Sequence, residues 1–114
     1  MNKVSFTENL DFNEHRIVTK VLMETPFSKE IRILLKKGQV MKEHQAPFPI
    51  IVHMVRGEID FGVQGTIHIL QQGDMITLGG RIPHDLSAKS DSIVRLTLSK
   101  SDTAERVEKV VYNS

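Results

Sequence analysis

Histidine supplies the side chains of this chain that are suited to metal or proton chemistry, because imidazole binds transition metals and exchanges protons near neutral pH. His44 lies three residues before Pro47, and His84 directly follows Pro83. There is no cysteine among the 114 residues, which excludes thiolate metal sites, disulfides and cysteine nucleophiles. The chain has five histidines to weigh for such chemistry, namely His15, His44, His53, His68 and His84.

The elements that must position these histidines are predicted to be β-strands. Runs rich in Val, Ile and Leu recur about every 8 to 12 residues between Gly, Pro or polar turns, which is typical of a β-sandwich or barrel. Glu58–Val63 alternates apolar and polar residues, and Gln64–Gly65 suits a tight hairpin turn. The predicted strands are Arg16–Met23, Glu30–Leu35, Gln39–His44, Ile50–Val55, Glu58–Val63, Thr66–Leu70, Met75–Leu78, His84–Ala88 and Ser92–Leu98.

The C-terminal tail has helical spacing instead. Val107, Val110 and Val111 recur on one helix face, and Asp102 is a capping residue with Glu105 three residues later. Glu and Lys share the polar face, so we expect the segment to pack against the barrel or a second subunit rather than a membrane.

Composition places residues 1–114 among soluble globular proteins of a single domain. Hydrophobic residues make up 39% and charged residues 25%, and the net charge is +1 from 15 basic and 14 acidic residues. These charges are well mixed, so the basic surface that nucleic-acid binding needs is not expected. No run approaches the roughly 20 apolar residues of a membrane span, and the N-terminal residues lack the apolar core of a secretory signal. We therefore expect a cytoplasmic protein that binds neither nucleic acid nor membrane.

One histidine-containing segment resembles the first motif of the cupin superfamily. It runs from Gly38 through His44 to Gly57 and keeps the spacing of that motif. Ala46 stands where the family has a second histidine, and Ile50 stands where it has a glutamate.

A second segment, from Gly73 to Ala88, resembles the second cupin motif. It keeps Gly73-Asp74 and Pro83-His84, whereas the Pro, Gly and Asn of the family are replaced by Gly79, Arg81 and Ala88. With both motifs in order on predicted strands, the chain resembles the small single-domain bacterial cupins of the cupin 2 type. The resemblance implies an all-β double-stranded β-helix, or jelly-roll barrel, with a short C-terminal helical segment.

The resemblance also implies a metal position inside the barrel. In the family, three ligands from the first motif and one histidine from the second hold one divalent metal, with an open coordination position. Carried over residue by residue, the metal ligands are His44 and His84, because Ala46 and Ile50 donate nothing. The implied cofactor is one divalent transition metal (Zn, Ni, Mn, Fe or Cu), and it needs a third ligand.

His53 is the less favoured candidate for that third ligand. If Ile50 points inward, Val52 and Met54 do so too and His53 points outward, unless a bulge reverses the order. The favoured interpretation is that His53 is a polar residue on the outer face of the barrel or at a dimer contact. A ligand role for His68 is no more favoured, and His15 is interpreted as a surface residue.

Six residues form the predicted ligand-binding set. Arg81 stands at the mouth of the barrel in the motif alignment, where it would hold a carboxylate or phosphate, although a solvated loop arginine is the favoured alternative. Met and Phe side chains in a small barrel line a cavity or simply form its core. The set is His44, Phe48, Ile50, Met54, Arg81 and His84.

Three functions remain open. A module that binds a small molecule in the barrel ranks first, because the pocket is predicted to be apolar at Ala46 and Ile50. A metal-dependent enzyme of the dioxygenase or isomerase type, using His44 and His84, ranks second, since no general base is apparent. A non-catalytic dimeric scaffold ranks third. A homodimer is expected in every case. Apolar residues occur on both faces of the strands predicted at Ile31–Leu35 and Ile50–Val55, which indicates that both faces are buried.

Overall fold

The computed structural model describes residues 1–100 and 104–114, with side chains in the last segment from Arg106 onward. The expected helix cap at Asp102 and the side chain of Glu105 lie outside the described residues. All nine predicted strands are present, and the C-terminal tail is helical. The elements are β1 (Val18–Glu24), β2 (Ser28–Leu35), β3 (Val40–His44), β4 (Ile50–Arg56), β5 (Glu58–Val63), β6 (Thr66–Gln71), β7 (Met75–Leu78), β8 (His84–Ala88), β9 (Ser92–Ser99) and α1 (Ala104–Tyr112).

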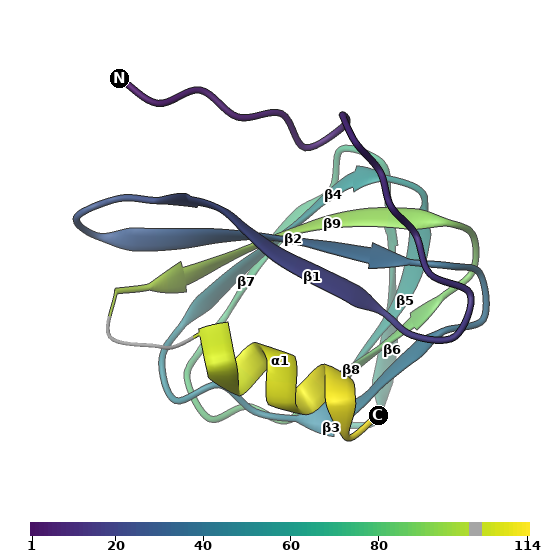
Figure 1. Ribbon diagram of the computed structural model, residues 1–114. Helices are drawn as coiled ribbons and strands as arrows, with labels where there is room; N and C mark the ends of the chain where they lie inside the picture. The colour runs from purple at the N-terminus through teal and green to yellow at the C-terminus, as the bar shows by residue number, and fades with distance from the viewer. Residues whose placement is uncertain (101–103) are drawn as a thin grey trace.

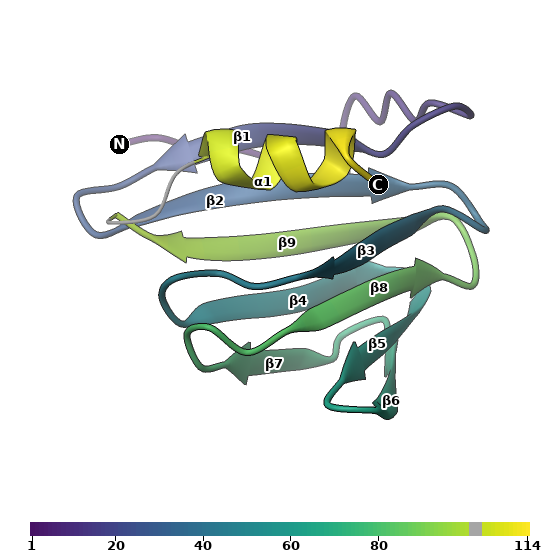
Figure 2. The ribbon, with the colours of Figure 1, turned by 90° about the horizontal axis from the view of Figure 1, so that it is seen from below.

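The strands form two antiparallel sheets that face each other as a jelly-roll barrel (Figures 1 and 2). One sheet has the order β1-β2-β9-β4-β7 and the other has the order β3-β8-β5-β6. Alternate residues of each strand enter the space between the sheets, as the two-residue period of a strand requires. The core includes Ile31, Ile33, Leu35, Met41, Ile50, Val52, Met54, Ile59, Phe61, Leu86, Ala88, Val94, Leu96 and Leu98.

Helix α1 covers the opening between β1 and β3, the edge strands on one side of the barrel (Figure 1). Its apolar face is buried through Val107 and Val111, which join the core, as the helical spacing predicted. Glu108 accepts a hydrogen bond from the Thr19 hydroxyl, and Ser114 Oγ accepts one from the Lys42 amide at 3.0 Å. No helix among the described residues is long and apolar enough to span a membrane.

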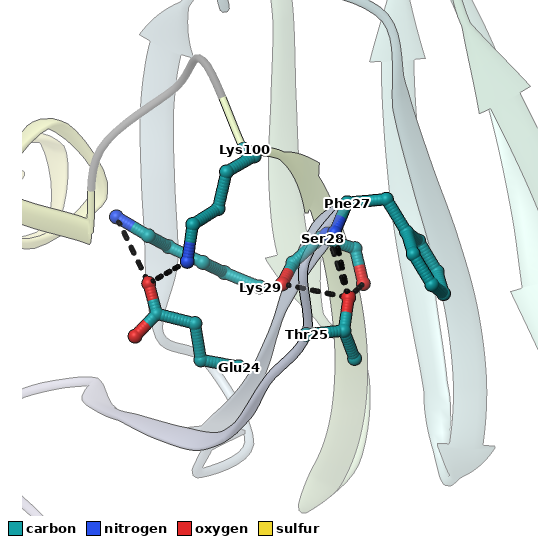
Figure 3. A network of polar contacts seen from close by, with 6 residues as sticks. All are labelled: Glu24, Thr25, Phe27, Ser28, Lys29 and Lys100. Carbon is teal, nitrogen blue, oxygen red and sulfur yellow. Dashed lines mark hydrogen bonds and ion pairs between the residues drawn. The ribbon is translucent and has the colours of Figure 1, made fainter.

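The β1–β2 hairpin is closed by a polar turn (Figure 3). Thr25 Oγ1 accepts hydrogen bonds from the amides of Phe27 and Ser28 at 3.2 and 2.8 Å, which fixes the turn before Ser28 enters β2. Glu24 pairs with Lys100 at 2.5 Å and with Lys29 at 4.0 Å, so the end of β9 is tied to the same turn. The predicted hairpin at Gln64–Gly65 is also confirmed, with φ of 50° and 79° as a type I′ turn requires.

Burial of β2 on both faces has its cause within the chain. Residues Ile31–Leu35 are all buried, and the outward-facing Arg32 donates hydrogen bonds to the carbonyl oxygens of Glu8 and Asn9 at 2.8 and 3.2 Å. The N-terminal segment therefore lies over this face of the sheet. On β4 the outward Ile51 is 38% exposed, so only one face of that strand is fully buried. The homodimer stays a prediction, since the burial of β2 does not require it.

Glu30 on the outer face of β2 is a buried carboxylate, 7% exposed. It accepts hydrogen bonds from Thr97 Oγ1 at 2.6 Å, Arg95 Nε at 2.8 Å and Ser28 Oγ at 2.8 Å. Burial by itself would raise the pKa of Glu30, but these hydrogen bonds outweigh it and hold the pKa below its usual value. Glu30 is therefore ionised in the folded protein at neutral pH.

We expect Glu30→Gln to lower the free energy of unfolding by about 2 kcal/mol at neutral pH, because charge-assisted hydrogen bonds are lost. Since the folded pKa is depressed, this stabilisation is present above the unfolded pKa and is lost as the pH falls through the folded pKa. Urea unfolding at neutral and acidic pH checks both points, and the two proteins should converge in acid. Glu24→Gln, at an exposed carboxylate, is the control and should change stability far less. Equal effects of the two substitutions would contradict the prediction.

Candidate functional site

The structure brings His44 and His84 together at the inner face of the four-stranded sheet. His44 ends β3 and His84 begins β8, and the two residues are partners across the antiparallel pair. Their ring centroids are 4.3 Å apart in an edge-to-face arrangement. Phe61 of β5 stacks on His84 with centroids 5.4 Å apart and planes 15° apart. The aromatic ring therefore fixes the plane of the His84 imidazole.

Both imidazoles are held in one tautomer by the backbone. His44 Nδ1 lies 2.7 Å from the carbonyl oxygen of Lys42, and His84 Nδ1 lies 2.8 Å from that of Ile82. A carbonyl oxygen only accepts, so each Nδ1 carries the proton and donates it. In the neutral ring each Nε2 is then an acceptor with a lone pair. The pair offers two nitrogen acceptors to a group that enters the space between the two sheets.

The environment of the pair keeps both rings neutral at pH 7. The pKa of His44 is lowered to about 4, and burial is the largest cause. The hydrogen bond to Lys42 raises this pKa, whereas electrostatic interactions with His84 and Arg106 lower it. Burial also lowers the pKa of His84, with Arg106 acting in the same direction and the Ile82 hydrogen bond opposing it. Asp85 raises both pKa values only weakly, and its carboxylate lies on the other side of the sheet beside Gly62.

A cavity of about 20 Å³ lies beside the two imidazoles. That volume holds about one water molecule, so α1 closes the barrel over the histidines. Most of the lining is apolar, and the polar groups in it are His44, His84 and Arg106. The lining residues are Ile33, Met41, His44, Ile50, Val52, Phe61, His84, Leu86, Val94, Leu96, Arg106 and Val107. We name this space the histidine pocket.

Three of the six predicted ligand-binding residues line the histidine pocket, namely His44, Ile50 and His84. The other three lie elsewhere. Met54 is wholly buried but packs in another part of the core, and Phe48 is 39% exposed in the segment before β4. Arg81 is an exposed loop residue with a φ of 63°, and its amide bonds to the carbonyl oxygen of Ala46 at 2.6 Å. The pocket therefore gains no contact from these three side chains.

Arg106 is the lining residue that the sequence analysis did not single out. It stands next to Val107 on α1, and its Nη1 donates to the carbonyl oxygen of Gln45 at 3.5 Å. The helical spacing of the tail was the available signal, since a residue beside the buried valines must lie near the surface that the helix covers. Only the docking of α1 across the barrel decides that this surface is the histidine pocket.

The remaining histidines do not join the pair. His53 points away from the barrel interior, as strand parity predicted, and lies in register with Arg95 and Met75 on the outer face of the five-stranded sheet. Its Nδ1 is buried and has no hydrogen-bond partner among the described residues. His68 is exposed in a groove between the edge strands β6 and β7, and His15 is exposed before β1.

The cupin motifs imply a metal held by imidazole and carboxylate donors. The two Nδ1–carbonyl hydrogen bonds orient imidazoles as in protein metal sites. However, Ala46 and Ile50 are buried and supply no donor, and within the described residues no three His, Asp or Glu side chains gather. A catalytic metal centre keeps three protein ligands, and this pocket provides two. The residues present do not fit a resident metal centre of that kind, and we derive no step through one.

No protein-family model matches the sequence, and no curated protein matches it. Solved structures do match. An RmlC-like cupin from Desulfovibrio desulfuricans is 22% identical, with a TM-score of 0.80 over 87% of this chain and 96% of the other. KdgF from Halomonas sp. is 21% identical, with a TM-score of 0.74 over 90% and 94%. This chain has the cupin fold.

A third likeness concerns a larger cupin. The cupin 2 conserved barrel domain protein from Leptotrichia buccalis is 29% identical, with a TM-score of 0.72 over 82% of this chain and 45% of that one. The fold that the two sequence motifs implied is confirmed. In this cupin barrel the glycines of the two motifs lie in turns, since Gly38, Gly57 and Gly73 all have positive φ. These positions explain the spacing of the motifs in physical terms.

Proposed function

We propose that this cupin barrel is a binding module that holds a small organic molecule at His44 and His84. The observation that carries the proposal is the pair of neutral imidazoles in an apolar pocket, each with Nδ1 committed to a backbone carbonyl. A few polar groups in an otherwise apolar concave site are typical of small-molecule pockets. The two Nε2 acceptors select a ligand that carries a hydroxyl or N–H donor.

Helix α1 takes part in this function. The histidine pocket has room for about one water molecule, so a larger ligand requires α1 to shift from its place between β1 and β3. Among the described residues, the polar contacts that hold the helix and the residues after it include the Thr19–Glu108, Lys42–Ser114 and Arg106–Gln45 hydrogen bonds. Ligand binding should therefore exchange the buried contacts of Val107 for contacts with the ligand.

The metal-dependent enzyme is the second candidate. It is favoured by the orientation of the two imidazoles and disfavoured by the missing third donor. A metal held here would have to complete its ligands from water or from the bound molecule. The dimeric scaffold is third, because a structural core has no need of two buried polar rings.

The test is a mass-spectrometric and elemental analysis of untagged protein purified without added metal. We expect a co-purifying organic molecule, and we expect less than one equivalent of transition metal per chain. In His44→Gln/His84→Gln the bound molecule should fall at least tenfold, about 1.4 kcal/mol of binding free energy. His68→Gln, at an exposed histidine outside the pocket, should retain the bound molecule.

The alternatives give different results in the same experiment. One equivalent of metal that is lost in the double variant would place the enzyme ahead. Protein free of both metal and organic molecule, and unchanged in melting temperature across a panel of small polar organic compounds, would contradict the binding module. Circular dichroism establishes that each variant retains the β-barrel.

A further inference from the structure

A groove of about 390 Å³ adjoins the histidine pocket on the outer side of α1. It lies between β3 and α1, and the Lys42 amide of β3 donates a hydrogen bond to Ser114 Oγ, just after the end of α1. His44 and Arg106 line both the groove and the histidine pocket, so the two spaces meet at these side chains. The volume of the groove lies within the range of sites for small organic ligands, about 300 to 1,000 Å³.

The groove is basic. Lys42, Arg106 and Lys109 line it, and Glu43 is the acidic side chain in its described lining. Lys42 and Lys109 are exposed, and neither forms an ion pair with a described residue. In the described lining, Lys42 and Lys109 outnumber Glu43, and Arg106 adds a guanidinium beside them. Exposed lysines around a concave site attract and orient anions. The well-mixed charge of the whole chain did not reveal this local excess.

His44 adds a hydrogen-bond acceptor at the inner end of the groove. Its Nδ1 donates to Lys42 O, so Nε2 is the atom left for a ligand, and the neutral ring accepts there. A carboxylate oxygen cannot donate to it, whereas a hydroxyl can. The groove therefore offers cations for an anionic group and an acceptor for a neighbouring hydroxyl.

We infer that the ligand of this barrel is a small hydroxylated organic acid. Its acidic group, a carboxylate or a phosphate, lies among Lys42, Lys109 and Arg106, and a hydroxyl of the same molecule donates to His44. This inference rests on the proposed function and specifies its ligand class. It also assigns α1 a direct part in binding, because two of the three cations belong to that helix.

The test is an NMR titration of the protein at neutral pH with three matched probes. The probe 3-hydroxybutyrate carries both groups, butyrate lacks the hydroxyl, and 3-hydroxybutyramide lacks the charge; glycerol 3-phosphate extends the series to phosphate. We expect the hydroxy acid to bind at least about tenfold more tightly than either truncated probe, with shifted amides at Lys42, Arg106 and Lys109 and weaker binding in salt. Tighter binding of glycerol 3-phosphate than of 3-hydroxybutyrate would assign the acidic group as phosphate.

Paired variants locate the effect. Lys42→Gln/Lys109→Gln should lose about tenfold in affinity for the acid but not for the amide. The control Lys20→Gln/Lys37→Gln removes two exposed lysines outside the groove and should retain wild-type affinity. Equal affinity for acid and amide, or full affinity in the groove variant, would overturn the inference while leaving a neutral ligand at the histidines intact. No binding of any acid up to about 10 mM would also overturn it, and the co-purification test would then decide separately whether the pocket binds a molecule at all.

Discussion

Between pH 6.5 and about 4 the folded protein should lose about 2 kcal/mol of stability through His44 alone. Burial holds the folded pKa near 4, whereas the unfolded side chain takes up a proton near 6.5. The unfolded state therefore binds more protons across this window, and stability falls as the pH falls. The full shift is worth about 3 kcal/mol, and we discount it because the ring also borders the basic groove, where solvent screens charge.

The measurement is urea unfolding at intervals across this pH range, together with an NMR titration of the His44 ring. His44→Gln removes the titrating group and should reduce the pH dependence of stability, while His15→Gln, at an exposed histidine, should leave it unchanged. His84, whose pKa burial also lowers, adds to the slope in the same direction. A His44 ring that titrates near 6.5 in the folded protein would contradict the prediction and the closed pocket from which it follows.

Gly57→Ala should lower the free energy of unfolding by about 3 kcal/mol or more. Gly57 joins β4 to β5 with a φ of 93°, which side-chain-bearing residues rarely adopt. A Cβ atom added there would lie 2.6 Å from the carbonyl oxygen of Asp91 and 2.8 Å from Cα of Ser92. These are backbone atoms of the β8–β9 connection and the start of β9, so relief of the clash requires the strand to move.

Gly38 provides a matched control for this substitution. Its φ is 91°, nearly the same as that of Gly57, but an added Cβ would meet no atom within 4 Å. Gly38→Ala should therefore cost only the backbone strain, about 1 to 2 kcal/mol. Thermal or urea unfolding of the two variants separates strain from steric overlap. Equal losses would show that the close approach of β9 to Gly57 contributes nothing.

The sequence alone determined the strands and the motifs. The strand at Glu58–Val63 was predicted from its alternation of apolar and polar residues, and the turn at Gln64–Gly65 from its residue types. Both features are determined by the local geometry of the backbone, so no tertiary information was needed. The segments from Gly38 to His44 and from Gly73 to His84 carried the resemblance to the cupin motifs, and that resemblance implied the jelly-roll barrel. Strand parity was sufficient to point His53 outward, because adjacent side chains on a strand face opposite ways.

Only the tertiary structure decided what the pocket contains. The cross-strand register of β3 and β8 sets the 4.3 Å approach of the two imidazole rings. The docking of α1 across the gap between the sheets brings Arg106 beside them from a distant part of the sequence. Arg81 was expected at the mouth of the barrel from the motif alignment, and Phe48 and Met54 were expected as apolar lining of the cavity, but residues of one motif segment need not share a cavity. The excess of positive charge in the basic groove also arises from residues that only the packing of α1 against β3 brings together. The alternation of apolar and polar residues along a strand, by contrast, depends only on residues that are neighbours in the sequence.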